Sequence, residues 1–132
     1  MGDRWEIEQL VLRVARCADR PDVGSLVDHF TADAVLAVGG RRVQGREAIR
    51  EFFGGTTAMP AEGERTKHVV TNTLVDTDGD AFVATSYWQL LRHWGLANWG
   101  RYIDRIVRDG DTWRIAHRSV LVDGQLGRPS GD

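Results

Sequence analysis

The sequence has few of the residues that mark metal clusters or disulfide-linked proteins. Its 132 residues include one cysteine, Cys17, which excludes an internal disulfide and a thiolate metal cluster. We interpret Cys17 as a small buried hydrophobe and not as a nucleophile, because no base is predicted beside it. His93 and His117 do not stand at metal-ligand spacing with His68, and no carboxylate pattern completes a metal site. The sequence therefore predicts no bound metal.

Long apolar runs and an excess of one charge are also missing. No apolar run approaches the roughly 18 residues of a membrane span, and the first residues lack the apolar centre of a signal peptide. The formal net charge is only −2, with both signs mixed along the chain, so no surface attractive to nucleic acid or an anionic membrane is predicted. No glycine-rich phosphate loop indicates a nucleotide cofactor. We expect a cytoplasmic protein that uses no cofactor.

Apolar residues recur at helical spacing in the first half of the chain. Between 5 and 18 they fall at intervals of three and four, which is typical of one face of an amphipathic helix. A shorter helix is expected from about Asp22, a suitable N-cap, and a third helix follows Gly45. The residues expected to face inward are Ile7, Leu10, Val11, Val14 and Ala18, then Val23, Leu26, Val27 and Phe30, then Ala48, Ile49, Phe52 and Phe53.

The second half of the chain has the character of β-strands joined by tight turns. A short hairpin is expected around Gly39-Gly40, and 56–66 is expected to be a loop. Long strands with turns or connections between them are then predicted over 67–76, 81–93, 99–107 and 112–122, with 94–98 as a connection. Helices first and antiparallel strands last indicate an α+β fold. Residues 1–123 are expected to form one domain and 124–132 a flexible tail.

Short segments spread over nearly the whole chain resemble a known family in their order and spacing. They are Leu12-Arg-Val-Ala with Asp19 and Asp22, Phe30-Thr-Ala-Asp-Ala-Val, Gly45-Arg-Glu-Ala-Ile-Arg-Glu-Phe-Phe, His68-Val-Val-Thr-Asn, Gly100-Arg-Tyr-Ile-Asp and Asp109-Gly-Asp-Thr-Trp-Arg-Ile. Together they resemble the SnoaL-like family of the nuclear transport factor two-like superfamily. The resemblance implies a cone-shaped, curved, mixed or antiparallel sheet, closed by three N-terminal helices around one apolar pocket. This fold hosts dehydratases, isomerases, polyketide cyclases, dehydrochlorinases and non-catalytic binders.

Asp19 and His68 form the sharpest candidate catalytic pair. A histidine at the mouth of an apolar face could take a proton from a carbon acid and return one to a leaving oxygen. A carboxylate on its other ring nitrogen would fix the tautomer and stabilise the imidazolium. Dehydratases and a dehydrochlorinase of the resembling fold use an aspartate and a histidine in the matching regions. The alternative is that Asp19 caps the second helix and His68 is a strand-end histidine with satisfied hydrogen bonds.

Val14 departs from the pattern of the resembling enzymes. Relatives with dehydratase or isomerase activity often have a tyrosine there, and its loss removes the usual donor to a developing enolate oxygen. Tyr102 is a candidate replacement, and Arg108 is a third candidate catalytic residue because it matches, roughly, an arginine of the dehydrochlorinase. Both are predicted to share one strand face with Asp104. Asp104 is either a second pocket acid or the partner of Arg118 on the next strand.

Further pocket-lining residues follow from strand alternation and from the tryptophans. Alternation from His68 places Asn72 on the same face, toward the pocket. Trp88 and Trp99 could line the pocket mouth and stack on a flat ligand. They could instead join Trp94 on the outer sheet face of a dimer, because aromatic residues are enriched at interfaces.

These observations favour a cofactor-independent lyase or isomerase of the dehydratase or cyclase type. The expected ligand is a small apolar, aromatic or polyketide-like metabolite, with His68 as the general base and Asp19 as its orienting partner. The alternatives are a non-catalytic small-molecule-binding protein, which Val14 favours, and a structural partner protein of the same fold. We expect a homodimer, because a curved sheet with apolar residues on both faces leaves one face uncovered.

Overall fold

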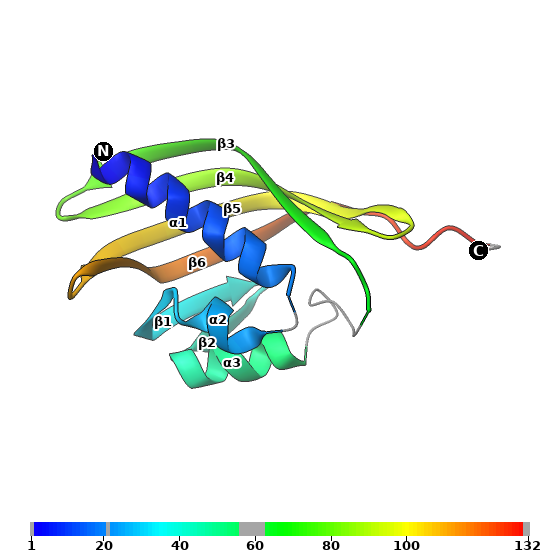
Figure 1. Cartoon of the computed structure of the whole chain (residues 1–132), viewed down its shortest axis with the longest axis horizontal. Coiled ribbons are helices and arrows are strands. Elements are labelled where there is room, and N and C mark those ends of the chain that lie inside the picture. Colours follow the sequence, from blue (N-terminus) through cyan, green and yellow to red (C-terminus); the bar gives the residue numbers. More distant parts are fainter. Residues whose placement is uncertain (1, 21, 56–62, 131–132) are drawn as a thin grey trace.

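The computed structural model describes residues 2–20, 22–55 and 63–130 (Figure 1). Within these residues two helices precede the first strand and a third follows the second strand. The six strands form one sheet. The helices are α1 (Asp3–Ala18), α2 (Val23–Val27) and α3 (Arg46–Gly54). The strands are β1 (Phe30–Val38), β2 (Arg41–Gln44), β3 (Lys67–Asp78), β4 (Ala81–Arg92), β5 (Gly95–Asp109) and β6 (Thr112–Gln125). No described helix is long and apolar enough to cross a membrane.

The strand order explains how one chain makes a mixed sheet. The order is β2-β1-β6-β5-β4-β3, and β1 pairs with β6 in parallel while the other neighbours are antiparallel. Figure 1 shows α1 lying across the long strands, with α2 and α3 gathered beside β1 and β2. The sheet is curved and unclosed, and the expected α+β architecture is confirmed.

The predicted apolar stripe of α1 is the part of the helix that meets the sheet. Ile7, Leu10, Val11 and Val14 are all nearly inaccessible to solvent. They pack in the main core with α2, α3 and the inner face of the sheet. Burying a side chain of this size stabilises the fold by about 1.5–3 kcal/mol. The stripe therefore fixes α1 as one wall above the concave sheet face.

Two expected boundaries at the long hairpins were wrong. The connection predicted over 94–98 is not a loop, because β4 ends at Arg92 and β5 already begins at Gly95. The last strand, expected over 112–122, runs on to Gln125, and the Leu126 N–H donates to the Ala97 oxygen at 2.6 Å. Of the loop expected over 56–66, residues 56–62 lie outside the described residues.

A bulge in β3 changes which side chains face inward. The register with β4 shifts between Thr71 and Leu74, and Asn72 adopts a left-handed backbone with φ of 56°. His68 and Val70 are partly buried, whereas Asn72 is exposed and Leu74 is 67% exposed. Alternation from His68 therefore predicts the inward face correctly only as far as Val70, because a bulge inserts an extra residue and breaks the period of two.

Candidate active site

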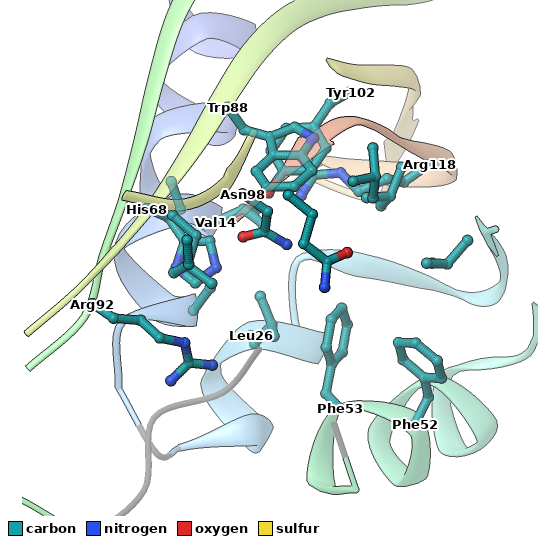
Figure 2. Close-up of a pocket in the computed structure, with 18 of the residues that line it drawn as sticks. Val14, Leu26, Phe52, Phe53, His68, Trp88, Arg92, Asn98, Tyr102 and Arg118 are labelled. Carbon is teal, nitrogen blue, oxygen red and sulfur yellow. The ribbon is translucent and has the colours of Figure 1, made fainter. Parts of the chain in front are cut away.

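A cavity of about 1040 Å³ opens between the helices and one end of the concave sheet. In Figure 2 the aromatic rings of Trp88 and Tyr102 lie on one side of it and those of Phe52 and Phe53 on the other. Most of the remaining wall is apolar, and a few polar side chains interrupt it. Its lining includes Val14, Ala15, Leu26, Leu36, Leu90, Val120, His68, Arg92, Asn98 and Arg118.

The Asp19–His68 pair stands at this cavity. Asp19 is the C-cap residue of α1, so the end of the helix places its carboxylate beside the start of β3. Its Oδ1 accepts a hydrogen bond from the backbone N–H of His68 at 2.6 Å and lies 2.9 Å from the ring Nδ1. The His68 side chain is 8% exposed and that of Asp19 17% exposed. The two side chains are therefore held together in a largely dry site.

The geometry decides which nitrogen of His68 can act on a ligand. An ionised carboxylate can only accept hydrogen bonds, so Nδ1 carries the proton in its bond to Asp19. In the neutral ring Nε2 then has a free lone pair, and His68 lines the cavity. The alternative role for Asp19 was to cap the second helix. In the structure Asp22 caps α2, by accepting a hydrogen bond from the Ser25 N–H at 3.3 Å.

Three side chains stack in the same region, and a fourth is hydrogen-bonded to the last of them. Trp88 and Tyr102 stack with ring centroids 5.8 Å apart and an interplanar angle of 21°. The Arg118 guanidinium lies 3.9 Å from the centroid of the Tyr102 ring. Its Nε and Nη2 donate to the Asp104 carboxylate at 2.7 and 2.8 Å. Asp104 is completely buried and Arg118 is 4% exposed, so Arg118 lines the cavity while Asp104 lies behind it.

Burial and these charges act on the acidity of Tyr102 in opposite directions. Burial raises the pKa of the Tyr102 phenol above its ordinary value, because the phenolate loses its hydration, while the nearby Arg118 charge works against that rise. The carboxylates of Asp104 and Asp19 add smaller upward effects on this pKa. Burial alone would lower the pKa of the Arg118 guanidinium. The charge and the hydrogen bonds of Asp104 outweigh burial, so the pKa is raised above its ordinary value and the guanidinium stays charged.

Several polar groups at the cavity have no hydrogen-bond partner or were not among the sequence candidates. The Asn98 Oδ1, which was not predicted, and the Nε1 of the predicted Trp88 are buried and have no hydrogen-bond partner among the described residues. Arg92 and Glu64 line the cavity as an ion pair, 2.5 Å between nitrogen and oxygen. Asn98 was missed because 94–98 was expected to be a connection. A two-residue turn after Arg92 would have put Asn98 and Tyr102 on one face of the strand.

Besides Asp19, which lies behind His68, four of the predicted site residues lie outside the cavity lining. Asn72 is exposed beyond the β3 bulge, and the ring of Trp99 covers Gly124 on the neighbouring strand. Asp104 lies behind the wall as the partner of Arg118. Arg108 lies beside a second, polar hollow of about 360 Å³, where its guanidinium stacks 5.1 Å from the Trp113 ring centroid.

The predicted cavity residues that do come together are Val14, His68, Trp88 and Tyr102, with Asp19 behind His68. In the part of the chain that the structure describes, no group of three or more histidine, cysteine or acidic side chains could hold a metal ion.

The α+β sheet thus wraps around a cavity, with a partly buried Asp–His pair at its wall. The chain belongs to the SnoaL-like domain family, whose model matches residues 1–119. No curated protein matches the sequence.

Solved structures agree with this family. A protein from Catenulispora acidiphila is 28% identical, with a TM-score of 0.78 and 91% of each chain covered. An NTF2-like protein with a cystatin-like fold from Novosphingobium aromaticivorans is 25% identical, with a TM-score of 0.82, covering 96% of this chain and 86% of that one. A candidate scytalone dehydratase from the same organism shares the fold at 17% identity, with a TM-score of 0.78 and coverage of 98% and 94%.

Proposed function

We propose that this protein is a cofactor-independent lyase or isomerase, of the dehydratase or cyclase type, that acts on a small apolar or aromatic ketone. The observation that carries the proposal is the 2.9 Å contact between Asp19 and Nδ1 of a histidine that lines the cavity. The contact leaves Nε2 of His68 as the base. A family whose fold neighbours include a candidate scytalone dehydratase is consistent with this chemistry.

The proposed reaction begins at the carbon beside the ligand carbonyl. Nε2 of neutral His68 takes the proton from this carbon, and the C–H electron pair moves into the enolate. Asp19 stabilises the imidazolium that forms. In a dehydration the enolate electrons then expel a β-hydroxyl group, which receives the proton from Nε2 and leaves as water. The products are a conjugated enone and water, and His68 returns to its neutral form.

Tyr102 is the proposed donor to the enolate oxygen. Its side chain lines the cavity and is 8% exposed, so the phenol lies in a largely dry site. Val14 supplies no donor from α1, so the phenol comes from β5 instead. Stabilising an oxyanion with one preorganised donor contributes on the order of 10²–10³ in rate.

The aromatic walls define the kind of ligand. Trp88 and Tyr102 on one side and Phe52 and Phe53 on the other favour a flat, largely apolar molecule. A non-catalytic binding protein is the second candidate, and the absence of a tyrosine at Val14 favours it. We also propose that the protein is a cytoplasmic homodimer that pairs through the outer sheet face.

Deuterium exchange tests the first step without knowledge of the natural substrate. Each of a panel of bicyclic aromatic ketones and β-hydroxyketones is incubated with the protein in D₂O. Mass spectrometry then measures deuterium beside the carbonyl, and absorbance measures enone formation. We expect wild type and His93→Gln, a control at the other histidine of the cavity lining, to exchange at least one ketone, and His68→Gln to be inactive. Binding without exchange in the wild type would instead establish the binding-protein function.

A further inference from the structure

The buried ion pair of Asp104 and Arg118 contacts Tyr102 in a way that the Asp19–His68 pair does not explain. Two nitrogens of Arg118 donate hydrogen bonds to Asp104, and its guanidinium stacks on Tyr102, 3.9 Å from the ring centroid. β5 and β6 place Asp104 directly opposite Arg118 in register, and Tyr102 opposite Val120. Burying a charge pair costs desolvation that an apolar pair avoids, and structural gain alone is a weak reason to keep one.

We propose that Arg118, held in place by Asp104, is a positioning residue that polarises the Tyr102 phenol and makes it a strong hydrogen-bond donor at the active site. The proposal rests on the function proposed above only for the use of that donor. The electrostatic relationship itself concerns three side chains of this chain and can be tested without turnover.

The physical reason is the state of the phenol in a dry cavity. Burial disfavours the phenolate, so an isolated Tyr102 would hold its proton tightly and give little to an enolate oxygen. A cation on the ring face stabilises negative charge as it develops on the phenol. Asp104 fixes the guanidinium in the stacked position and restrains its effect, because a carboxylate opposes ionisation of the phenol.

Asp19 is the other charged side chain that acts on Tyr102, and it also opposes ionisation. His68 lines the same cavity, with its Nδ1 bonded to Asp19. From α1 the cavity receives only apolar side chains, Val14, Ala15 and Ala18. Arg118 is therefore the cation that counteracts burial at this phenol.

The sequence makes the measurement simple because it contains two tyrosines, and the other, Tyr87, is 50% exposed. A Tyr87→Phe background leaves Tyr102 as the single tyrosine. Growth on 3,5-difluorotyrosine then labels this position with a phenol acidic enough to titrate while the protein is folded. The pKa of the label is read by ¹⁹F NMR in this background, and again with Arg118→Met or Asp104→Asn added.

We expect the two variants to shift the label in opposite directions. Arg118→Met should raise its pKa by about 1–3 units, the usual effect of losing a neighbouring opposite charge, and Asp104→Asn should lower it. A merely structural ion pair would loosen the site in both variants and shift both the same way, which would overturn the proposal. So would a label that does not respond to Arg118→Met.

Arg118→Met leaves Asp104 buried without a partner, so this variant could fail to fold. A second variant keeps the proposal testable in that case. The double variant Arg118→Met with Asp104→Leu replaces the pair by apolar side chains, which proteins often tolerate. Its label should titrate above that of the parent, and an unchanged pKa would overturn the proposal. If the shifts appear but no ketone is turned over, the proposed function fails while the role of Arg118 stands.

Discussion

One oxygen of Asp19 serves both the backbone and the ring of His68. Oδ1 lies 2.6 Å from the backbone nitrogen and 2.9 Å from Nδ1 of the same residue. The contact joins the C-terminal end of α1 to the first residues of β3, 49 positions later in the sequence. The first bond fixes the position of the His68 backbone, and the second fixes the orientation of its ring. The carboxylate therefore has a structural and a chemical role at once.

This dual contact predicts the behaviour of dyad variants in any assay that reports proton abstraction. Asp19→Asn should lower turnover on the order of 10² or more, because an amide can hold the wrong tautomer and cannot stabilise an imidazolium. His68→Ala should abolish turnover. The double variant should be little worse than His68→Ala, since the two residues act as one unit. Additive losses would show that they act separately.

Asp22→Ala is the matched control for Asp19. Asp22 caps α2 through the Ser25 N–H, and losing such a cap costs about 0.5–2 kcal/mol of stability. Asp19→Ala leaves the partly buried His68 N–H unpaired and should cost about 1–3 kcal/mol. Thermal or urea unfolding should show both losses, whereas only Asp19→Ala should affect turnover. Full activity in Asp19→Ala would reduce Asp19 to a structural residue.

Gly100 and Gly54 predict opposite effects of adding one methyl group. A Cβ at Gly100 would overlap the backbone oxygen of Leu121 and lie 2.9 Å from the Trp88 ring, so Gly100→Ala must displace backbone. We expect a loss of at least about 1–3 kcal/mol, the usual cost of overpacking. Gly54, at the end of α3, has open space at the same position, and Gly54→Ala should be neutral or stabilising by about 0.5–1 kcal/mol. Urea unfolding of the two variants measures the difference, and equal effects would contradict it.

Tyr102 also predicts how stability changes at alkaline pH. Its pKa is raised in the folded state above the ordinary value of 10.0, first because of burial. The stability linked to the neutral phenol is therefore fully present below about pH 10 and is lost as the pH rises through the folded-state value. Thermal unfolding midpoints should fall less steeply above pH 10 in Tyr102→Phe than in the wild type. An equal slope in the wild type and in Tyr102→Phe would contradict the prediction.

The outer sheet face predicts dimerisation. Tyr87 is 50% exposed and Ile103 40% exposed on adjacent strands, with Val69 and Leu91 nearby at 37% and 38%. Light scattering should give about twice the 14.8 kDa chain mass for the wild type, and the monomer mass for Tyr87→Lys with Ile103→Lys. Leu12→Lys, at a 41% exposed position on α1, should remain dimeric. A monomeric wild type at micromolar concentration would contradict the prediction.

The sequence predicted the architecture better than the composition of the cavity wall. Periodicity located the buried stripe of α1 because Ile7, Leu10, Val11 and Val14 repeat over several turns. The Asn72 bulge could not be read, since one inserted residue leaves the pattern of Val and Thr in β3 intact. Asn98 was missed because Gly95 was not recognised as the start of a strand.

Charge pairing across strands was harder to predict than position along them. Arg118 could be matched to Asp104 as one of two open interpretations, but its contact with Tyr102 depends on the exact register of β5 and β6. Arg108 shares a strand face with Tyr102 yet lies too far along β5 to reach the same cavity, and it packs on Trp113 instead. A face can be read from alternation, whereas a position along the cavity requires the fold.

The parallel pairing of β1 with β6 determines the order in which the sheet can form during synthesis. As the chain leaves the ribosome, β1 can form its hairpin with β2 at once, but its other edge has no partner until residues 112–125 have emerged. Contacts such as Phe30 with Ile115 span most of the chain, and such non-local pairing slows folding and leaves strand edges open to association. The cavity wall formed by Arg118 and Val120 is added in the same last step. A nascent chain therefore carries Asp19 and His68 well before it has a pocket in which they could meet a ligand.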